Sequence, residues 1–145
     1  MVNGDVFGAN SVFSDTNENT VSIASDGANR SNVKNVYSGK SGANAAMKNV
    51  VKLADSDVNG DVYGGYSEGA DATGNSVTIK EANVEGSVYG GYSESGDASD
   101  NTLNFDSGKV KDFLYGGYSE NKDVSGNTIN IKGVNLAKTS IYGER

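Results

Sequence analysis

Apolar and polar residues alternate in short runs along the chain, and the runs come in pairs. In the clearest pair, apolar or small residues occupy every second position over residues 58–66 and again over residues 77–79. A period of two places successive side chains on opposite faces of a β-strand. Segments rich in Gly, Asp, Asn and Ser, which are typical turn residues, separate the runs. The pattern therefore predicts two or three short strands in each unit.

The same string of residues returns at a constant spacing. Val-Tyr-Gly-Gly-Tyr-Ser-Glu begins at Val62 and again at Val88, and a version that starts with leucine begins at Leu114. The two intervals between these starts are equal. The same step, 26 residues, separates the asparagines that precede the second run of each unit, which are Asn75, Asn101 and Asn127. Self-similarity at a fixed period is the signature of stacked repeats.

Weaker copies continue the repeat toward both ends of the chain. Tyr37 and Asn49 belong to a degenerate copy that keeps the same register. Phe7 and Asn19 belong to a further copy, which keeps the register if four extra residues are placed around residues 26–31. We therefore expect one all-β repeat domain over residues 1–145, a parallel β-solenoid of about five coils of this period. The expected coils are residues 2–31, 32–57, 58–83, 84–109 and 110–135, with a partial coil at 136–145 that starts one residue late.

In this register, apolar residues of one phase point inward and stack on their equivalents in the next coil, ~4.8 Å away. The expected core is Val58, Val62, Val77, Ile79, Val84, Val88, Leu103, Phe105, Val110, Leu114, Ile129 and Ile131. Small and apolar residues between positions 43 and 54 also keep helical spacing. An amphipathic helix is therefore the alternative for that segment.

Composition excludes several kinds of chemistry. Glycine supplies 20 of the 145 residues and hydrophobic residues supply 35%, which suits a thin core continued from coil to coil. Histidine and cysteine are absent, so a nucleophile with a histidine base, a thiolate metal site and a disulfide are excluded. Glu68, Glu94 and Glu120 recur beside the tyrosines, but a catalytic carboxylate pair is not expected in every coil. We expect no enzymatic activity.

Charge and hydropathy make two classes of binding partner, nucleic acids and membranes, unexpected for this chain. The net charge is -7, and Arg30 and Arg145 are the only arginines, so a surface that follows nucleic-acid phosphates is not expected. The sequence has neither a membrane-spanning apolar run nor a signal-peptide core. We therefore expect that this segment binds no nucleic acid and does not insert into a membrane.

One file of aromatic rings is the main candidate for ligand binding. Its residues are Tyr37, Tyr63, Tyr89 and Tyr115, extended by Phe7 and Tyr142. If Val62 faces inward, this file faces outward, beside glycines that leave the backbone uncovered. Exposed rings offer sugars or partner side chains a stacking platform. The alternative is a stabilising ladder without a ligand. Tyr66 and its equivalents are expected to pack at a corner over Gly64.

The turn before each repeated asparagine offers a possible cation site. Asp71, Asp97 and Asp123 begin these turns, and such oxygen ligands could hold calcium between coils. The spacing differs from the nine-residue calcium-binding repeat, and Asp, Asn and Gly are ordinary turn residues. Turn structure is the favoured interpretation. No other cofactor is expected.

The order of these motifs resembles a known family of repeats. The repeat resembles those in the passenger regions of bacterial autotransporters. The resemblance lies in the order of its motifs, which is Val-Tyr-Gly-Gly-Tyr-Ser-Glu, then Gly-Asp-Ala and Asn-Thr or similar residues, then an apolar triplet. The resemblance covers residues 58–143 closely and residues 2–57 loosely. It implies an extracellular place at the bacterial outer-membrane surface and an adhesin or stalk role, with a host or neighbouring-cell surface protein or glycan as partner. It implies an excised passenger fragment and no catalytic residue.

Two other functions compete with the adhesin or stalk. A carbohydrate-binding module would use the tyrosine file as its stacking platform. A fibre would form by end-to-end self-association, because open solenoid ends expose strand edges that can pair with another chain.

Overall fold

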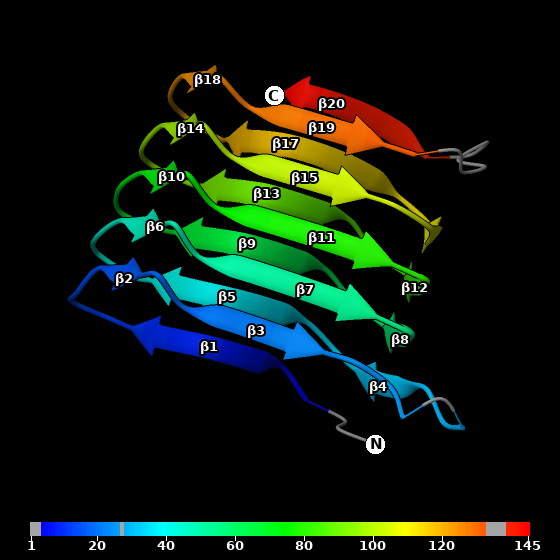
Figure 1. The fold of residues 1–145 in the computed structure, drawn as a ribbon. Helices are drawn as coiled ribbons and strands as arrows, with labels where there is room; N and C mark the ends of the chain where they lie inside the picture. Colours follow the sequence, from blue (N-terminus) through cyan, green and yellow to red (C-terminus); the bar gives the residue numbers. More distant parts are fainter. Residues whose placement is uncertain (1–3, 27, 133–138) are drawn as a thin grey trace.

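Each turn of the chain passes through four sheets and returns one strand further along each of them (Figure 1). The structure is a computed structural model that describes residues 4–26, 28–132 and 139–145. Strands of successive turns pair in parallel in all four sheets. The described residues therefore form a parallel β-solenoid, as the repeat predicted. Among them, no helix is long and apolar enough to cross a membrane.

The sheets, named A to D, differ in the length of their strands. Sheet A contains β1 (Val6–Ser11), β5 (Val36–Ser41), β9 (Val62–Ser67), β13 (Val88–Ser93), β17 (Phe113–Ser119) and β20 (Ser140–Glu144). Sheet B contains β2 (Thr16–Asn17), β6 (Ala46–Met47), β10 (Ala72–Thr73), β14 (Ala98–Ser99) and β18 (Val124–Ser125). Sheet C contains β3 (Thr20–Ile23), β7 (Val50–Ala54), β11 (Ser76–Lys80), β15 (Thr102–Phe105) and β19 (Thr128–Ile131). Sheet D contains β4 (Ser31–Val33), β8 (Ser56–Val58), β12 (Ala82–Val84) and β16 (Gly108–Val110).

A complete unit thus has four strands, where the sequence predicted two or three. A turn at residues 59–61 splits the alternating run over residues 58–66, so Val58 ends β8 and Val62 begins β9. Gly60 lies in this turn, and a Cβ added there would overlap the Asn35 amide oxygen. Glycine leaves room for the neighbouring coil at the point where the chain changes direction.

The predicted register is confirmed in the regular part of the stack. Val62 pairs with Val88 and Val88 pairs with Leu114, so both pairs keep the step of the sequence repeat. Tyr115 pairs with Tyr142, a separation one residue longer than this step, as expected for a copy that starts one residue late. The beginning of that partial coil, residues 136–138, lies outside the described residues.

The first step of the solenoid differs in detail from the prediction of four extra residues. The separation between Ile23 and its partner Leu53 is four residues longer than the regular step, whereas that between Val33 and Val58 is one residue shorter. Five extra residues therefore lie between β3 and β4. The connection from β4 to β5 is one residue shorter than the connection from β8 to β9, which restores the net shift of four.

One continuous cluster of apolar side chains fills the space between the sheets. The predicted inward residues that are buried are Val58, Val62, Val77, Ile79, Val84, Val88, Leu103, Phe105, Val110 and Leu114. Ile129 is half-buried and packs against them. Ile131 is 40% exposed, contrary to its assignment to the core, because β19 is the edge strand of sheet C. A residue in an edge strand has a packing partner on one side only.

Residues 46–47 form β6 and residues 50–54 form β7, so the helical alternative for this segment is wrong. In β7, Val51 pairs with Val77 and Leu53 pairs with Ile79. Both are buried in the common core. The strand conformation prevails because it continues the backbone hydrogen bonds and the apolar files of the neighbouring coils.

The glycine pair of the three regular repeats breaks the alternation of sheet A. A Cβ at Gly64 would lie 3.2 Å from Cγ2 of Val77, and a Cβ at Gly65 would overlap the Asn75 amide group. Both glycines therefore face the interior in succession, and the two tyrosines that flank them, Tyr63 and Tyr66, share the outer face. The expectation that Tyr66 packs over Gly64 at a corner is wrong.

Replacing a core residue should cost far more stability than replacing its outward neighbour. Ile79→Ala should lower the free energy of unfolding by about 2–5 kcal/mol, because Leu53 and Phe105 cover the site from both sides and a cavity would remain. Thr78→Ala, on the outer face of the same strand, should cost less than ~1 kcal/mol. Denaturant unfolding of both variants tests this, and equal losses would contradict the inward and outward assignment.

Candidate functional site

The predicted aromatic file forms a continuous stack on the outer face of sheet A. Its members, one in each coil, are Phe7, Tyr37, Tyr63, Tyr89, Tyr115 and Tyr142. Neighbouring ring centroids lie 4.8–5.3 Å apart, and the ring planes differ by 14° or less. This distance is close to the spacing of adjacent strands, so in-register pairing alone brings the rings face to face. We call these residues the first file.

A second file stands beside the first and was not predicted. Tyr66, Tyr92 and Tyr118 stack at 4.9 Å. They meet the first file edge-on, with Tyr66 at 90° to Tyr63 and Tyr92 at 87° to Tyr89, a favourable arrangement of aromatic pairs. The sequence does repeat a second tyrosine in these coils. The face of the sheet on which its side chain lies depends on the glycine pair, however, and alternation alone does not predict it. The outer face of sheet A is therefore a double aromatic layer.

The rings of the first file are less accessible than a binding platform requires. Tyr63 is 9% exposed and Tyr115 is 6% exposed, and Tyr37 and Tyr89 are half-buried. Each ring face lies against the ring of an adjacent coil, and the second file covers one edge. Sugar rings bind aromatic faces, and those of the four candidate residues are already occupied by one another.

Carboxylates accept hydrogen bonds from three phenol groups of this double layer. The Tyr66 hydroxyl donates to Oε1 of Glu94, and the Tyr92 hydroxyl donates to Oε1 of Glu120. The Tyr63 hydroxyl donates to Oδ2 of Asp61 at 3.3 Å. Two of the three repeated glutamates therefore accept a hydrogen bond from a tyrosine of the coil before.

The phenols keep their protons well above neutral pH. Burial, followed by the hydrogen bond to Glu94, raises the pKa of the Tyr66 phenol, and burial with Glu120 does the same for the pKa of Tyr92. Burial, with the Asp61 charge as a further cause, raises the pKa of Tyr89 to about 12 and also raises the pKa of Tyr63. Desolvation disfavours the phenolate, and a nearby carboxylate repels it.

Two cations of the chain complete the aromatic face. Lys40 pairs with Tyr66 in the sheet register, so it occupies the second-file position in its own coil. Its Nζ lies 5.3 Å from the Tyr66 ring centroid and 5.6 Å from the Tyr37 centroid, and 3.5 Å from Oε1 of Glu68. The Arg145 guanidinium lies 4.8 Å from the Tyr142 centroid. These cation–π contacts lie at the ends of the tyrosine stacks, with Lys40 before the second file begins and Arg145 beside the last ring of the first file.

The repeated asparagines form a ladder inside the corner between sheets B and C. Nδ2 of Asn49, Asn75 and Asn101 donates to Oδ1 of the next asparagine at 3.1, 3.0 and 2.9 Å. Nδ2 also donates to a backbone carbonyl of the preceding coil, and Oδ1 also accepts the backbone N–H of the asparagine before. Asn75 and Asn101 are buried. The amide of Asn101 thus uses both donor hydrogens and both acceptor positions.

The aspartates considered for calcium contact the backbone of the next turn. Oδ1 of Asp71 accepts the N–H of Asp97 at 2.9 Å, and Oδ1 of Asp97 accepts the N–H of Asp123 at 3.3 Å. These contacts are those of turn residues. Within residues 4–26, 28–132 and 139–145, no group of three or more acidic side chains is arranged to hold a metal ion.

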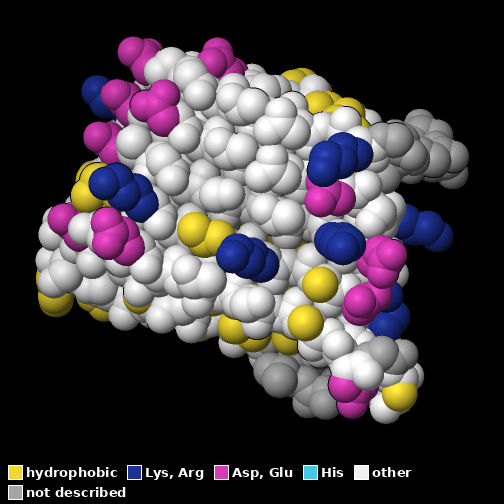
Figure 2. Space-filling model, viewed as in Figure 1, with side chains coloured by type: hydrophobic (Ala, Val, Ile, Leu, Met, Phe, Trp, Pro, Cys, Tyr) yellow, Lys and Arg dark blue, Asp and Glu magenta, His cyan; other side chains and the backbone are white. Residues whose placement is uncertain are grey.

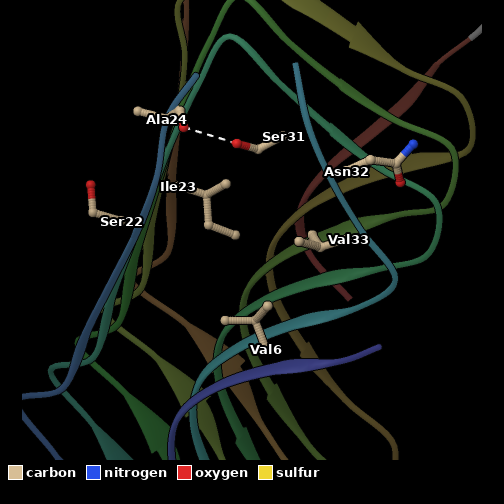
Figure 3. Close-up of a pocket in the computed structure, with 7 residues that line it drawn as sticks. All are labelled: Val6, Ser22, Ile23, Ala24, Ser31, Asn32 and Val33. Carbon is tan, nitrogen blue, oxygen red and sulfur yellow. Dashed lines mark hydrogen bonds between the residues drawn. The ribbon is translucent and has the colours of Figure 1, made fainter. Parts of the chain in front are cut away.

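A cavity of about 290 Å³ opens beside the first coil, between β1, β3 and β4 (Figure 3). Val6, Ile23 and Val33 supply apolar walls, and the Ser31 hydroxyl donates to the Ala24 carbonyl at 2.9 Å. Ala24, which follows β3, also lines this space. The described residues that line it include no titratable side chain.

Sheet C presents a different surface from sheet A. Figure 2 shows this side of the molecule, with uncharged side chains over much of its centre and most charged side chains toward its left and right edges. Two outward rows cross β11, β15 and β19, consisting of Ser76, Thr102 and Thr128 and of Thr78, Asn104 and Asn130. Nδ2 of Asn130 donates to Oδ1 of Asn104 at 2.8 Å. We call these six residues the polar grid.

Comparison of the chain with protein-family models, with curated proteins and with solved structures gave no match in any of the three. Functional inference therefore rests on the residues and their geometry.

The asparagine ladder can be distinguished from a metal site by one substitution. Asn101→Asp should lower the free energy of unfolding by about 1–3 kcal/mol, because it removes both donors of a buried amide and introduces a charge. Asn104→Asp is the control, because its side chain lies on the outer face and keeps an acceptor for Asn130. Thermal unfolding is measured in chelator and in calcium. A calcium-dependent gain for Asn101→Asp would overturn the ladder and support the cation site.

Alkaline pH should unfold the chain through its phenols. The pKa of Tyr89 is about 12 in the folded chain, against 10.0 for an ordinary tyrosine. The folded state therefore binds more protons than the unfolded state between these values, so this stabilisation is complete below pH 10.0 and is lost as the pH rises toward 12. Phenolate absorbance should appear together with loss of the β-sheet circular dichroism signal. Gradual ionisation near pH 10.0 in a chain that stays folded would contradict the burial of these rings.

Proposed function

We propose that this chain is a non-enzymatic, surface-exposed repeat scaffold, an adhesin or stalk segment of a secreted bacterial passenger of the autotransporter type. The observation that carries the proposal is that the recurring polar side chains contact the neighbouring coil. Asparagine amides bond to one another, glutamates bond to tyrosines, and aspartates accept backbone N–H groups. The residues that define the repeat serve its stacking.

The recurring serines support the same interpretation. The Ser67 hydroxyl donates to the Asn44 carbonyl of the preceding coil at 2.7 Å and accepts the N–H of Ala70 at 3.0 Å. The Ser93 hydroxyl makes the equivalent pair with Ala70 and Gly96. A nucleophilic serine needs a neighbouring base, whereas these hydroxyls are held by backbone groups at a turn.

The polar grid is the surface we assign to partner contact. Its side chains point away from the core on a sheet, and they offer both donors and acceptors without a formal charge. Hydroxyl and amide groups of this kind suit hydrogen bonding to a glycan or to the polar surface of a host or neighbouring-cell protein. Its position on a sheet holds these groups in fixed relative places, which lowers the entropic cost of binding. We propose that the chain lies outside the cell, at the bacterial surface.

The two competing functions receive less support from the geometry. A carbohydrate-binding module based on Tyr37, Tyr63, Tyr89 and Tyr115 would need ring faces that are engaged in stacking. For fibre formation, the described residues place six strands in sheet A and five in each of sheets B and C. If β1 of a second copy paired with β20, the described strands would therefore support backbone pairing along sheet A alone.

Surface display tests the proposal. Bacteria that display the chain on an outer-membrane translocator should be retained on host-cell or glycan-coated surfaces better than bacteria that display the translocator alone. The double substitution Thr78→Lys and Asn104→Lys, in the polar grid, should lower retention several-fold. Binding of a partner would bury two lysine charges without a counter-charge, and this desolvation opposes binding. Ser95→Lys, at an exposed turn, is the matched control and should leave retention unchanged.

Two results separate the roles within this proposal. Retention equal to that of the bare translocator would exclude the adhesin role and leave the stalk. Rapid digestion of the displayed chain by external protease would exclude the stalk as well, because a stalk must stay folded outside the cell.

A further inference from the structure

The second tyrosine file carries chemical groups that stacking does not require. Phe7 occupies a first-file position and stacks on Tyr37 at 4.9 Å, so a ring without a hydroxyl is sufficient for a ladder. The hydroxyls of Tyr66 and Tyr92 are nevertheless each placed on a glutamate carboxylate. A phenol with a carboxylate partner has a base positioned to take its proton.

We propose that Tyr66 and Tyr92 are a site of oxidative modification, at which a one-electron oxidant joins their rings into a covalent cross-link between neighbouring coils. Their ring centroids are 4.9 Å apart and their planes differ by 2°. Both lie in strands whose register places them directly opposite each other. The product would be a carbon–carbon bond between the two rings, at the carbons next to the hydroxyl-bearing carbons.

The reaction balances with two molecules of oxidant. Each phenol gives one electron to one oxidant molecule and its hydroxyl proton to a carboxylate, Glu94 for Tyr66 and Glu120 for Tyr92. The two phenoxyl radicals pair at the carbon next to the oxygen-bearing carbon, where unpaired spin resides, because the opposite ring carbon already bears Cβ. Each ring then loses its proton at the new bond and each oxygen regains one. The net change is the loss of two hydrogen atoms as two electrons and two protons.

Geometry favours the second file over the first for this chemistry. Tyr66 and Tyr92 are half-buried, whereas Tyr63 is 9% exposed, so an oxidant in solution reaches the second file more readily. Burial and the adjacent carboxylates raise the pKa of both Tyr66 and Tyr92. A phenol that keeps its proton at neutral pH loses it together with the electron, and the hydrogen-bonded carboxylate accepts it. Among the described residues, no carboxylate accepts from the Tyr118 hydroxyl, so the pair Tyr66 and Tyr92 is the one in which both phenols are activated.

Photo-oxidation of the purified chain tests the proposal. The oxidant is ruthenium tris-bipyridyl with persulfate under visible light, and the readouts are dityrosine fluorescence, migration on a denaturing gel and peptide mass spectrometry. Trypsin cuts after Lys80, which leaves Tyr66 and Tyr92 on different peptides. The expected product is a monomeric chain two hydrogen atoms lighter, in which fragmentation places the link between Tyr66 and Tyr92.

Variants identify the role of each group. Tyr92→Phe should abolish this link while keeping the stack, as Phe7 does in the first file. Glu94→Gln keeps a hydrogen-bond acceptor but not the base, and the initial rate of cross-linking should fall about tenfold, less than a positioned base can contribute because solvent also reaches this phenol. Glu68→Gln, whose carboxylate pairs with Lys40, and Tyr89→Phe are the matched controls and should leave the rate unchanged. Circular dichroism verifies that each variant is folded.

Two results would overturn the proposal. One is a link that maps to Tyr63 and Tyr89, or that joins separate chains, in place of the Tyr66 and Tyr92 link. The other is an equal fall in rate for Glu94→Gln and Glu68→Gln, which would show that the carboxylate on the phenol has no special role.

Discussion

In-register parallel stacking is the constraint on which this structure depends. Each residue lies beside its own equivalent in the adjacent coil, one strand spacing away. Residue types that gain by self-contact suit such a position. Valine and leucine stack into a core, phenol rings stack face to face, and the amides of Asn75 and Asn101 bond to each other. The low share of hydrophobic residues is sufficient because every apolar residue inside the stack is covered from two sides.

Charged residues are the difficult case under the same constraint, since like charges in neighbouring coils repel. The structure resolves this by giving repeated carboxylates a hydrogen-bond or ion-pair partner. Glu68 pairs with Lys40, Glu94 accepts from Tyr66, and Asp71 accepts a backbone N–H of the next turn. Repeated acidic residues can therefore be stacked because each of them contacts a polar or charged partner. The same arrangement places a base on each of two phenols, and this is the origin of the chemistry we infer for the second file.

The glycine pair determines which surface the solenoid presents. A Cβ at Gly65 would overlap the Asn75 amide group, and a Cβ at Gly64 would overlap the Gly90 carbonyl oxygen. Two consecutive inward residues then bring Tyr63 and Tyr66 onto one face. The aromatic residues become a self-covered double layer, and contact with a partner passes in our proposal to the polar grid of sheet C. A local packing requirement thus underlies our choice between two candidate binding surfaces.

The sequence by itself determined the features that follow from its period. A constant step of 26 residues sets the register of every strand pair between β9 and β17, and with it the inward valines, the first aromatic file and the asparagine ladder. Translation along a stack converts sequence spacing directly into contact, so no knowledge of the coil cross-section is needed. The same logic recovered the late start of the final copy, in which Tyr115 pairs with Tyr142.

Only the tertiary structure decided what depends on the path of the chain within one coil. Alternation predicts side-chain direction only along an unbroken strand, and the turn at residues 59–61 and the inward glycine pair both break it. The pairing of Tyr66 with Glu94 crosses coils at a spacing of 28 residues, two more than the period, so it depends on where the two side chains point. The exposure of Ile131 depends on what lies beyond its strand. These features are set by volume and direction in three dimensions, which a one-dimensional period does not contain.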